Sequence, residues 1–130
     1  MEVMEESRGY VLLVDDDKDF AKVVRLYLEK SGMEVAVALS GKKALKAFDA
    51  RKPDVMILDV NMPKMDGMEV CSAVRAKMGT QHLPIIALTA FHSPEKKKQM
   101  MEVGADVYLT KPMDLKKLVA QVEQLIGGSK

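Results

Sequence analysis

The chain has 130 residues, of which 48% are hydrophobic and 30% charged, and its formal net charge at pH 7 is +1. This length fits a single domain, and the near-neutral charge gives no reason to expect nucleic acid or an acidic membrane surface as a partner. No apolar run approaches the roughly 20 residues of a membrane-spanning helix, and the acidic first residues do not resemble a signal peptide. The lone cysteine, Cys71, excludes an internal disulfide and favours a reducing cytoplasm.

Short apolar runs, each followed by polar or turn residues, predict β-strands. In chain order these strands cover residues 11–14, 34–39, 55–58, 85–88 and 107–110, and the second of them is a weaker, partly alternating run. Runs that are short and almost wholly apolar are typical of strands covered on both faces of a sheet.

The segments between and after these strands have the apolar spacing of helices together with start and stop signals. In chain order the predicted helices cover residues 18–31, the stretch between Ser40 and Pro53, residues 68–78, the stretch between Ser93 and Gly104, and residues 115–126. Strands that alternate with helices predict an α/β fold, in which a doubly wound parallel sheet carries helices on both faces. Residues 10–127 are expected to form this domain, between a polar lead-in at 1–9 and a tail at 128–130.

Polar side chains stand where most of the predicted strands end. They are the consecutive acids Asp15, Asp16 and Asp17, then Asp59, Thr89 and Lys111. In a βα repeat all strands run the same way, so these residues are expected on the carboxyl edge of the sheet, where open α/β sheets bind ligands. A single polar strand end would be read as a loop or capping residue, whereas several at one edge predict a site.

The residue types at this edge indicate phosphoryl chemistry. Clustered carboxylates repel one another by about 4 kcal/mol per pair at 4 Å and an effective dielectric near 20, so they need a positive partner. Lys111 supplies one charge, and an all-oxygen cluster suits a hard cation such as Mg²⁺, which usually completes its shell with water and phosphate oxygens. A carboxylate such as Asp59 is an established type of phosphoryl acceptor, and Thr89 offers a hydroxyl to the other oxygens.

The segments VLLVDDD, VMILDVNMPKMDG, IIALTA and YLTKP together resemble the marks of the response-regulator receiver domain of two-component signalling. The resemblance runs from about residue 10 to residue 126. It implies a flavodoxin-like sheet of five strands in the order 2-1-3-4-5, an order that the handedness of crossovers alone does not determine.

The resemblance implies that Asp59 accepts phosphate from a phosphohistidine on a sensor histidine kinase or phosphotransfer protein. It implies that Asp16 binds Mg²⁺ directly, with Asp15 beside it, and that Asn61 lends its backbone carbonyl to the metal. Asp17 is a third consecutive acid, and the choice of Asp15 and Asp16 for the metal is inferred from alignment to the strand end.

For the rest of the site, the resemblance implies that Thr89 and Lys111 hold the phosphoryl oxygens. Tyr108 matches the aromatic switch that turns inward once Thr89 moves, and the bond from Lys111 to Pro112 is expected to be cis. The face formed by the fourth helix, fifth strand and fifth helix is expected to bind a downstream protein whose identity the sequence does not give.

Two other functions stay open at this point. One is a small aspartyl-phosphate phosphatase resembling the haloacid dehalogenase group, whose nucleophile would be Asp15, although Asp19 stands where that group has Thr or Val. The other is a receiver-like binding module that signals without phosphate. The leading interpretation is a signalling domain that assists only its own phosphorylation and dephosphorylation, not an enzyme acting on other substrates.

Overall fold

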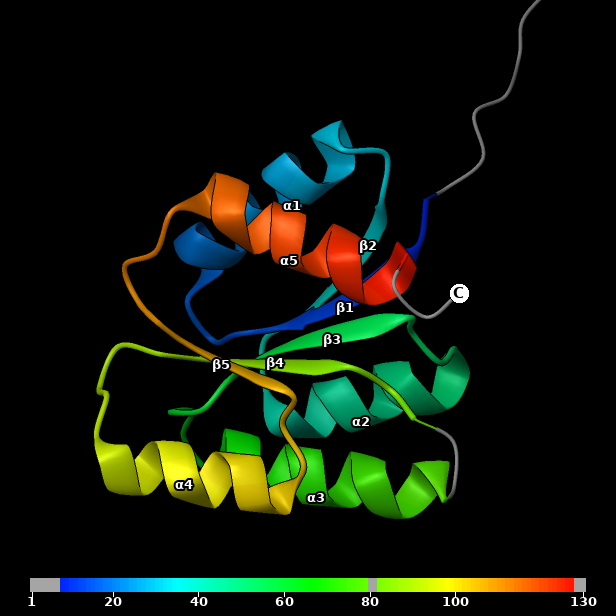
Figure 1. The fold of residues 1–130 in the computed structure, drawn as a ribbon. Coiled ribbons are helices and arrows are strands. Elements are labelled where there is room, and N and C mark those ends of the chain that lie inside the picture. Colours follow the sequence, from blue (N-terminus) through cyan, green and yellow to red (C-terminus); the bar gives the residue numbers. More distant parts are fainter. Residues whose placement is uncertain (1–7, 80–81, 128–130) are drawn as a thin grey trace, which may run out of the picture.

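The computed structural model describes residues 8–79 and 82–127, within which five strands alternate with five helices (Figure 1). The strands are β1 (Tyr10–Val14), β2 (Glu34–Ala38), β3 (Val55–Asp59), β4 (Ile85–Thr89) and β5 (Val107–Thr110). The helices are α1 (Lys18–Lys30), α2 (Gly41–Ala50), α3 (Gly67–Met78), α4 (Pro94–Val103) and α5 (Leu115–Gly127). Residues 1–7 of the predicted lead-in and residues 128–130 of the predicted tail lie outside the described residues.

The strands form one parallel sheet in the order β2-β1-β3-β4-β5, which confirms the order implied by the resemblance. The strands β3 and β4 are each one residue longer than predicted, because backbone pairing continues through Asp59 beside Leu88 and through Thr89 beside Thr110. Asp59 and Thr89 are therefore the last residues of their strands, held by the regular ladder of the sheet, and not the first residues of loops.

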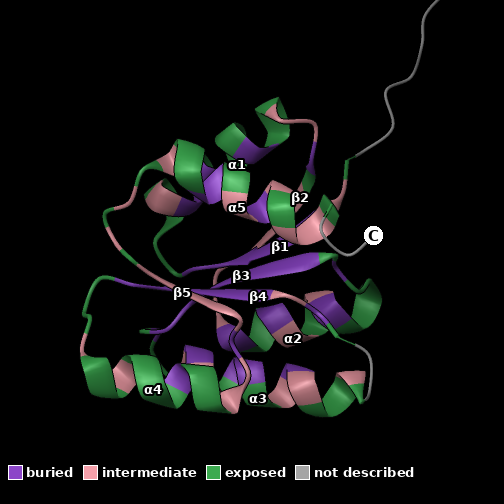
Figure 2. Ribbon diagram, in the orientation of Figure 1, coloured by how far each residue is buried: buried purple, intermediate pink, exposed green. Residues whose placement is uncertain are grey.

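Helices cover both faces of the sheet (Figure 1). On one face α1 and α5 bury Val24, Leu28 and Val122 against the sheet, and on the other α2, α3 and α4 bury Phe48, Cys71 and Met100, among others. The three central strands β1, β3 and β4 are buried along their whole length, whereas the edge strands β2 and β5 are mostly half-buried, and the helices expose their outer sides (Figure 2). Burial on both faces explains why β1, β3 and β4 read as apolar runs, whereas the half-buried edge strand β2 alternates in part.

Arg75 on α3 joins three segments at the amino edge of the sheet. Its guanidinium donates to the carbonyl oxygen of Gly104 from Nε at 3.1 Å and from Nη2 at 2.6 Å, and to the carbonyl oxygen of Leu83 at 2.6 Å. It also pairs with Asp106 at 3.0 Å, and Asp106 in turn accepts the backbone N–H of Ile85 at 2.8 Å. The end of α4 and the starts of β4 and β5 are thereby fixed to α3.

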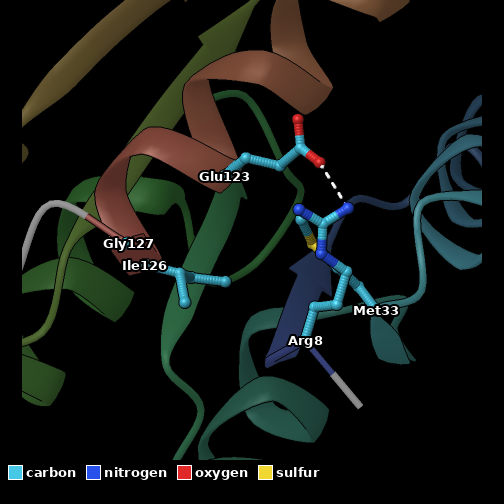
Figure 3. Close-up of a pocket in the computed structure, with 5 residues that line it drawn as sticks. All are labelled: Arg8, Met33, Glu123, Ile126 and Gly127. Carbon is cyan, nitrogen blue, oxygen red and sulfur yellow. Dashed lines mark ion pairs between the residues drawn. The ribbon is translucent and has the colours of Figure 1, made fainter. Parts of the chain in front are cut away.

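A hollow of about 290 Å³ also lies at the amino edge, lined by Arg8, Met33, Glu123, Ile126 and Gly127 (Figure 3). Arg8 and Glu123 form an ion pair of 3.0 Å across it. Because Arg8 and Met33 precede β1 and β2, the hollow lies at the opposite edge from the predicted site. None of the described helices has the length and apolar character that a membrane span requires.

Candidate functional site

Four predicted site residues meet at the carboxyl edge of the sheet. Asp15 follows β1, Asp59 ends β3, Thr89 ends β4 and Lys111 follows β5. The sheet order makes β1, β3, β4 and β5 consecutive neighbours, and the parallel register keeps their ends level. Residues up to 96 positions apart in the chain are in this way brought within hydrogen-bond distance.

Asp15, Asp59 and Thr89 are the buried polar or charged residues of the described ranges, with exposed fractions of 0%, 5% and 0%. Burying a carboxylate is unfavourable unless it is paired or hydrogen-bonded. Within the described residues no buried side-chain nitrogen or oxygen lacks a hydrogen-bond partner, so the buried polar atoms at this edge are all bonded.

Lys111 lies between two of the acids. Its Nζ is 2.7 Å from Asp15 Oδ2 and 3.9 Å from Asp59 Oδ1, and its side chain is only 17% exposed. The bond from Lys111 to Pro112 is cis, as the resemblance implies. The ammonium group neutralises part of the negative charge at this edge, and a charge-assisted bond to Asp15 is among the stronger hydrogen bonds in proteins.

A cluster of three carboxylates could hold a metal ion. One oxygen each from Asp15, Asp16 and Asp59 lies within 4.8 Å of the others, and Asp16 is exposed while the other two are buried. Hard divalent cations take oxygen ligands, and Mg²⁺ in particular keeps several waters and uses only a few carboxylates. The donor set and its open side at Asp16 fit such an ion.

Burial raises the pKa of the Asp59 carboxyl from its ordinary 3.8 to about 7, and the Asp15 carboxylate adds to this rise. The Lys111 ammonium and the N–H of Asn61 act in the opposite direction. Carboxyl groups with a strongly shifted pKa are typical of functional sites. A buried carboxylate is attracted to a cation more strongly than an exposed one, because water screens its charge less.

Asp17, the third consecutive acid, has a different role from its neighbours. Its side chain caps α1 by accepting the backbone N–H groups of Asp19 and Phe20, both at 3.1 Å. Its own N–H donates to Asp15 Oδ1 at 2.9 Å. The helix start therefore uses Asp17, which agrees with the choice of Asp15 and Asp16 for the acidic cluster.

Thr89 and Asn61 are joined side chain to side chain, which the sequence did not predict. Thr89 Oγ1 donates to Asn61 Oδ1 at 2.6 Å and accepts the N–H of Phe91 at 3.0 Å. The N–H of Asn61 donates to Asp59 Oδ1 at 3.2 Å. No local sequence pattern distinguishes an Asn whose side chain reaches a residue on a neighbouring strand.

Gly67, the first residue of α3, packs against the backbone that carries Asp59. A Cβ at Gly67 would lie 2.6 Å from the carbonyl oxygen of Asp59 and 2.7 Å from Val60 Cα, closer than real Cβ contacts. A capping box formed by Asp66 and Glu69 fixes the helix start at this point. Glycine is thus required here by a close approach of two backbone segments.

Tyr108 is half-buried on β5, next to Ala87 in register. Its hydroxyl lies 3.4 Å from His92 Nδ1, and the two ring centroids are 5.6 Å apart. Burial raises the pKa of the Tyr108 phenol. His92 is exposed, and because its contact with Tyr108 joins a loop to a strand, no local sequence pattern indicates it.

The family follows from comparison with known proteins. Residues 11–123 match the model of the response regulator receiver domain. The chain belongs to this family. The transcriptional regulatory protein PrrA of Mycobacterium tuberculosis is 41% identical over 116 residues, which are 89% of this chain and 49% of PrrA. PhoP of Bacillus subtilis, an alkaline phosphatase synthesis regulator, is 38% identical over 119 residues, or 92% of this chain and 49% of PhoP.

Among solved structures, the receiver domain of a Francisella response regulator has a TM-score of 0.86 and 34% identity, covering 94% of this chain and 99% of that one. The chain spans about half the length of the curated relatives it matches. As a receiver domain of a two-component system, the chain is a signalling module rather than a classical enzyme. The family implies a histidine kinase as partner. The acidic cluster of Asp15, Asp16 and Asp59 is compatible with a divalent metal ion.

Proposed function

We propose that this domain accepts a phosphoryl group on Asp59 from a phosphohistidine of a sensor histidine kinase or phosphotransfer protein. The convergence of Asp15, Asp16, Asp59 and Lys111 at one edge supports this function, with Lys111 Nζ at 2.7 Å from Asp15 and 3.9 Å from Asp59. An ammonium between the acids lies within reach of oxygens on a phosphorus that is bonded to Asp59. Such transfers depend mainly on positioning and neutralisation of charge.

In this reaction an oxygen of Asp59 attacks the phosphorus, and the bond from phosphorus to the histidine nitrogen breaks. The electron pair stays on that nitrogen, which takes up a proton. Lys111 and the Thr89 hydroxyl bind the non-bridging oxygens, and Thr89 must leave Asn61 to do so, because its one proton is already donated there. The Asn61 N–H keeps Asp59 oriented.

Asp15, Asp16, Asp59 and the backbone carbonyl of Asn61 would hold Mg²⁺. The bound ion supplies charge neutralisation for the acids and the incoming phosphoryl group. Without a cation the buried acids carry more negative charge than Lys111 offsets, which is unfavourable for an anionic phosphate.

The direct test uses acetyl phosphate as donor, with Mg²⁺, and detects the phosphoryl group by intact mass. The parent chain is expected to label once and Asp59→Asn not at all. Asp49→Asn serves as the matched control, because Asp49 is an exposed acid paired with Lys77 on the far ends of α2 and α3. Full labelling of Asp59→Asn overturns the proposal.

The same assay separates the two other functions. Steady hydrolysis of a phosphomonoester that is lost in Asp15→Asn and kept in Asp59→Asn would indicate the phosphatase. Absence of Mg²⁺ binding by calorimetry together with absence of labelling would indicate a module that signals without phosphate.

We further propose that phosphorylation changes the surface formed by α4, β5 and α5, where a downstream protein would bind. We also propose that the protein works in the cytoplasm. Tyr108 supports the choice of this surface, because it lies on β5 beside the loop that joins Thr89 to α4 and contacts His92 in that loop. Beryllofluoride, a phosphoryl mimic, is expected to change amide hydrogen exchange in α4 and β5 more than in α2. Equal changes in both regions would contradict this surface.

A further inference from the structure

The Lys111 ammonium has a third neighbour besides the two carboxylates. Its Nζ lies over the ring of Phe20, 4.3 Å from the ring centroid. A cation within about 6 Å of an aromatic face is attracted by the negative charge density of the ring. Because the Lys111 side chain is only 17% exposed, water screens this attraction less than it would at the surface.

Phe20 is held in place by the same residues that hold the acids. Its N–H donates to Asp17 Oδ1 at 3.1 Å, and the N–H of Asp17 donates to Asp15 Oδ1 at 2.9 Å. Asp15 Oδ2 in turn accepts from Lys111 at 2.7 Å. Asp15, Asp17, Phe20 and Lys111 therefore form a closed ring of contacts, in which the start of α1 sets the ring face at a fixed place beside the ammonium.

The ring differs from the carboxylates in one chemical respect. Asp15 and Asp59 are candidate ligands of a divalent cation, and a cation bound to them withdraws part of the charge that attracts Lys111. The ring is neutral, does not ligate hard cations, and keeps its attraction for the ammonium when the acids are engaged. Lysine has a flexible stem, so a group that restricts its ammonium reduces the entropy lost when it binds a phosphoryl oxygen.

We propose that Phe20 is a positioning residue for Lys111, whose ring face holds the ammonium at the distance from Asp59 at which it binds a phosphoryl oxygen. This inference rests on the proposed phosphoryl acceptance at Asp59. A packing role alone would depend on the size of the residue at position 20, whereas this role depends on the charge distribution of its ring.

The experiment changes that charge distribution with little change of shape. Phe20 is replaced by singly, triply and fully fluorinated phenylalanine, and the affinity for beryllofluoride with Mg²⁺ and the rate of labelling by acetyl phosphate are measured. Both are expected to fall stepwise with fluorination, by roughly three- to tenfold for the fully fluorinated ring. Phe20→Tyr, which keeps the ring face, is expected to stay within twofold of the parent chain.

Two controls make the test specific. Tyr27→Leu removes an exposed ring from the same helix and is expected to change neither quantity. In a Lys111→Met background the fluorination series is expected to lose its effect on beryllofluoride affinity, because the ring then has no cation to hold.

A fully fluorinated ring that keeps the parent affinity and rate within twofold overturns the positioning role of Phe20, and leaves phosphorylation of Asp59 intact. An undiminished fluorination effect without Lys111 also overturns it. If the parent chain binds no beryllofluoride and accepts no phosphate, the proposed function itself fails, and this inference fails with it.

Discussion

Thr89 donates its only hydroxyl proton to the side chain of Asn61, at 2.6 Å, so the two residues are bonded to each other before any phosphoryl group arrives. If Thr89 holds a phosphoryl oxygen in the phosphorylated state, this bond must break first. The bond then opposes phosphorylation by its net free energy, typically about 0.5 to 1.5 kcal/mol.

Asn61→Ala is therefore expected to bind beryllofluoride with Mg²⁺ about two- to tenfold more tightly than the parent chain, since the backbone carbonyl at position 61 remains. The affinity is measured by titration at constant Mg²⁺. In a Thr89→Val background the same substitution should have no effect, because there is no hydroxyl to release. Weaker binding in both backgrounds would show that the Asn61 side chain assists the bound state.

Asp59 makes the stability of the metal-free protein depend on pH. Its folded-state pKa of about 7 lies above the ordinary 3.8, so between these values the folded state keeps a proton that the unfolded state has lost. The contribution of Asp59 to the free energy of unfolding therefore falls as pH rises from about 4 through 7, by an amount on the order of 4 kcal/mol. Urea unfolding with a chelator across this range measures the slope.

Asp59→Asn is the matched variant for that measurement. The amide at position 59 cannot ionise, so the variant should lack the part of the pH dependence of the free energy of unfolding that Asp59 contributes. It should therefore be more stable than the parent chain above pH 7. An Asn variant with the same slope as the parent chain would contradict the assignment of the raised pKa to Asp59.

Lys111→Met is expected to affect stability and metal affinity in opposite directions. Without the ammonium, the fully buried Asp15 loses its ion-pair partner, which should destabilise the metal-free protein by roughly 3 kcal/mol. The acids then attract a cation more strongly, so Mg²⁺ should bind at least about tenfold more tightly. Calorimetric titration measures the affinity, and unchanged Mg²⁺ binding would count against a shared site.

Arg75→Met tests the cluster at the amino edge. It removes the donors for two backbone carbonyls and leaves Asp106 without its guanidinium, so a loss of roughly 3 kcal/mol in the free energy of unfolding is expected. Lys77→Met on the same helix breaks only the exposed pair with Asp49 and should change it by less than about 1 kcal/mol. Similar losses in both variants would mean that Arg75 contributes no more than a surface charge.

The sequence predicted the backbone of this protein well because its signals are local. Apolar runs covered on both faces identify strands, and Ser40, Asp66 and Ser93 cap helices where the chain turns. The site followed from topology: once the strands are parallel, their carboxyl ends share an edge. The resemblance supplied the strand order, which periodicity does not contain.

The parts that were missed are contacts between single residues on different elements. Nothing in the sequence distinguishes Phe20 from the other apolar residues of its helix, and Arg75 and Asp106 carry no pattern that marks them as partners. His82 is exposed, yet its Nε2 lies 3.0 Å from Asp106 Oδ1. Such pairs depend on side-chain directions that are fixed only after the helices have packed.

The tight fit at Gly67 gives a way to test the proposed phosphate acceptance without altering any charge. Replacing its hydrogen with one methyl group forces either α3 or the end of β3 to shift, and the second shift carries the Asp59 carboxyl with it. A Gly67→Ala protein would keep every acid, the lysine and the net charge of the parent. Loss of labelling by acetyl phosphate in this variant would therefore reflect a displaced Asp59 backbone and not a change of charge.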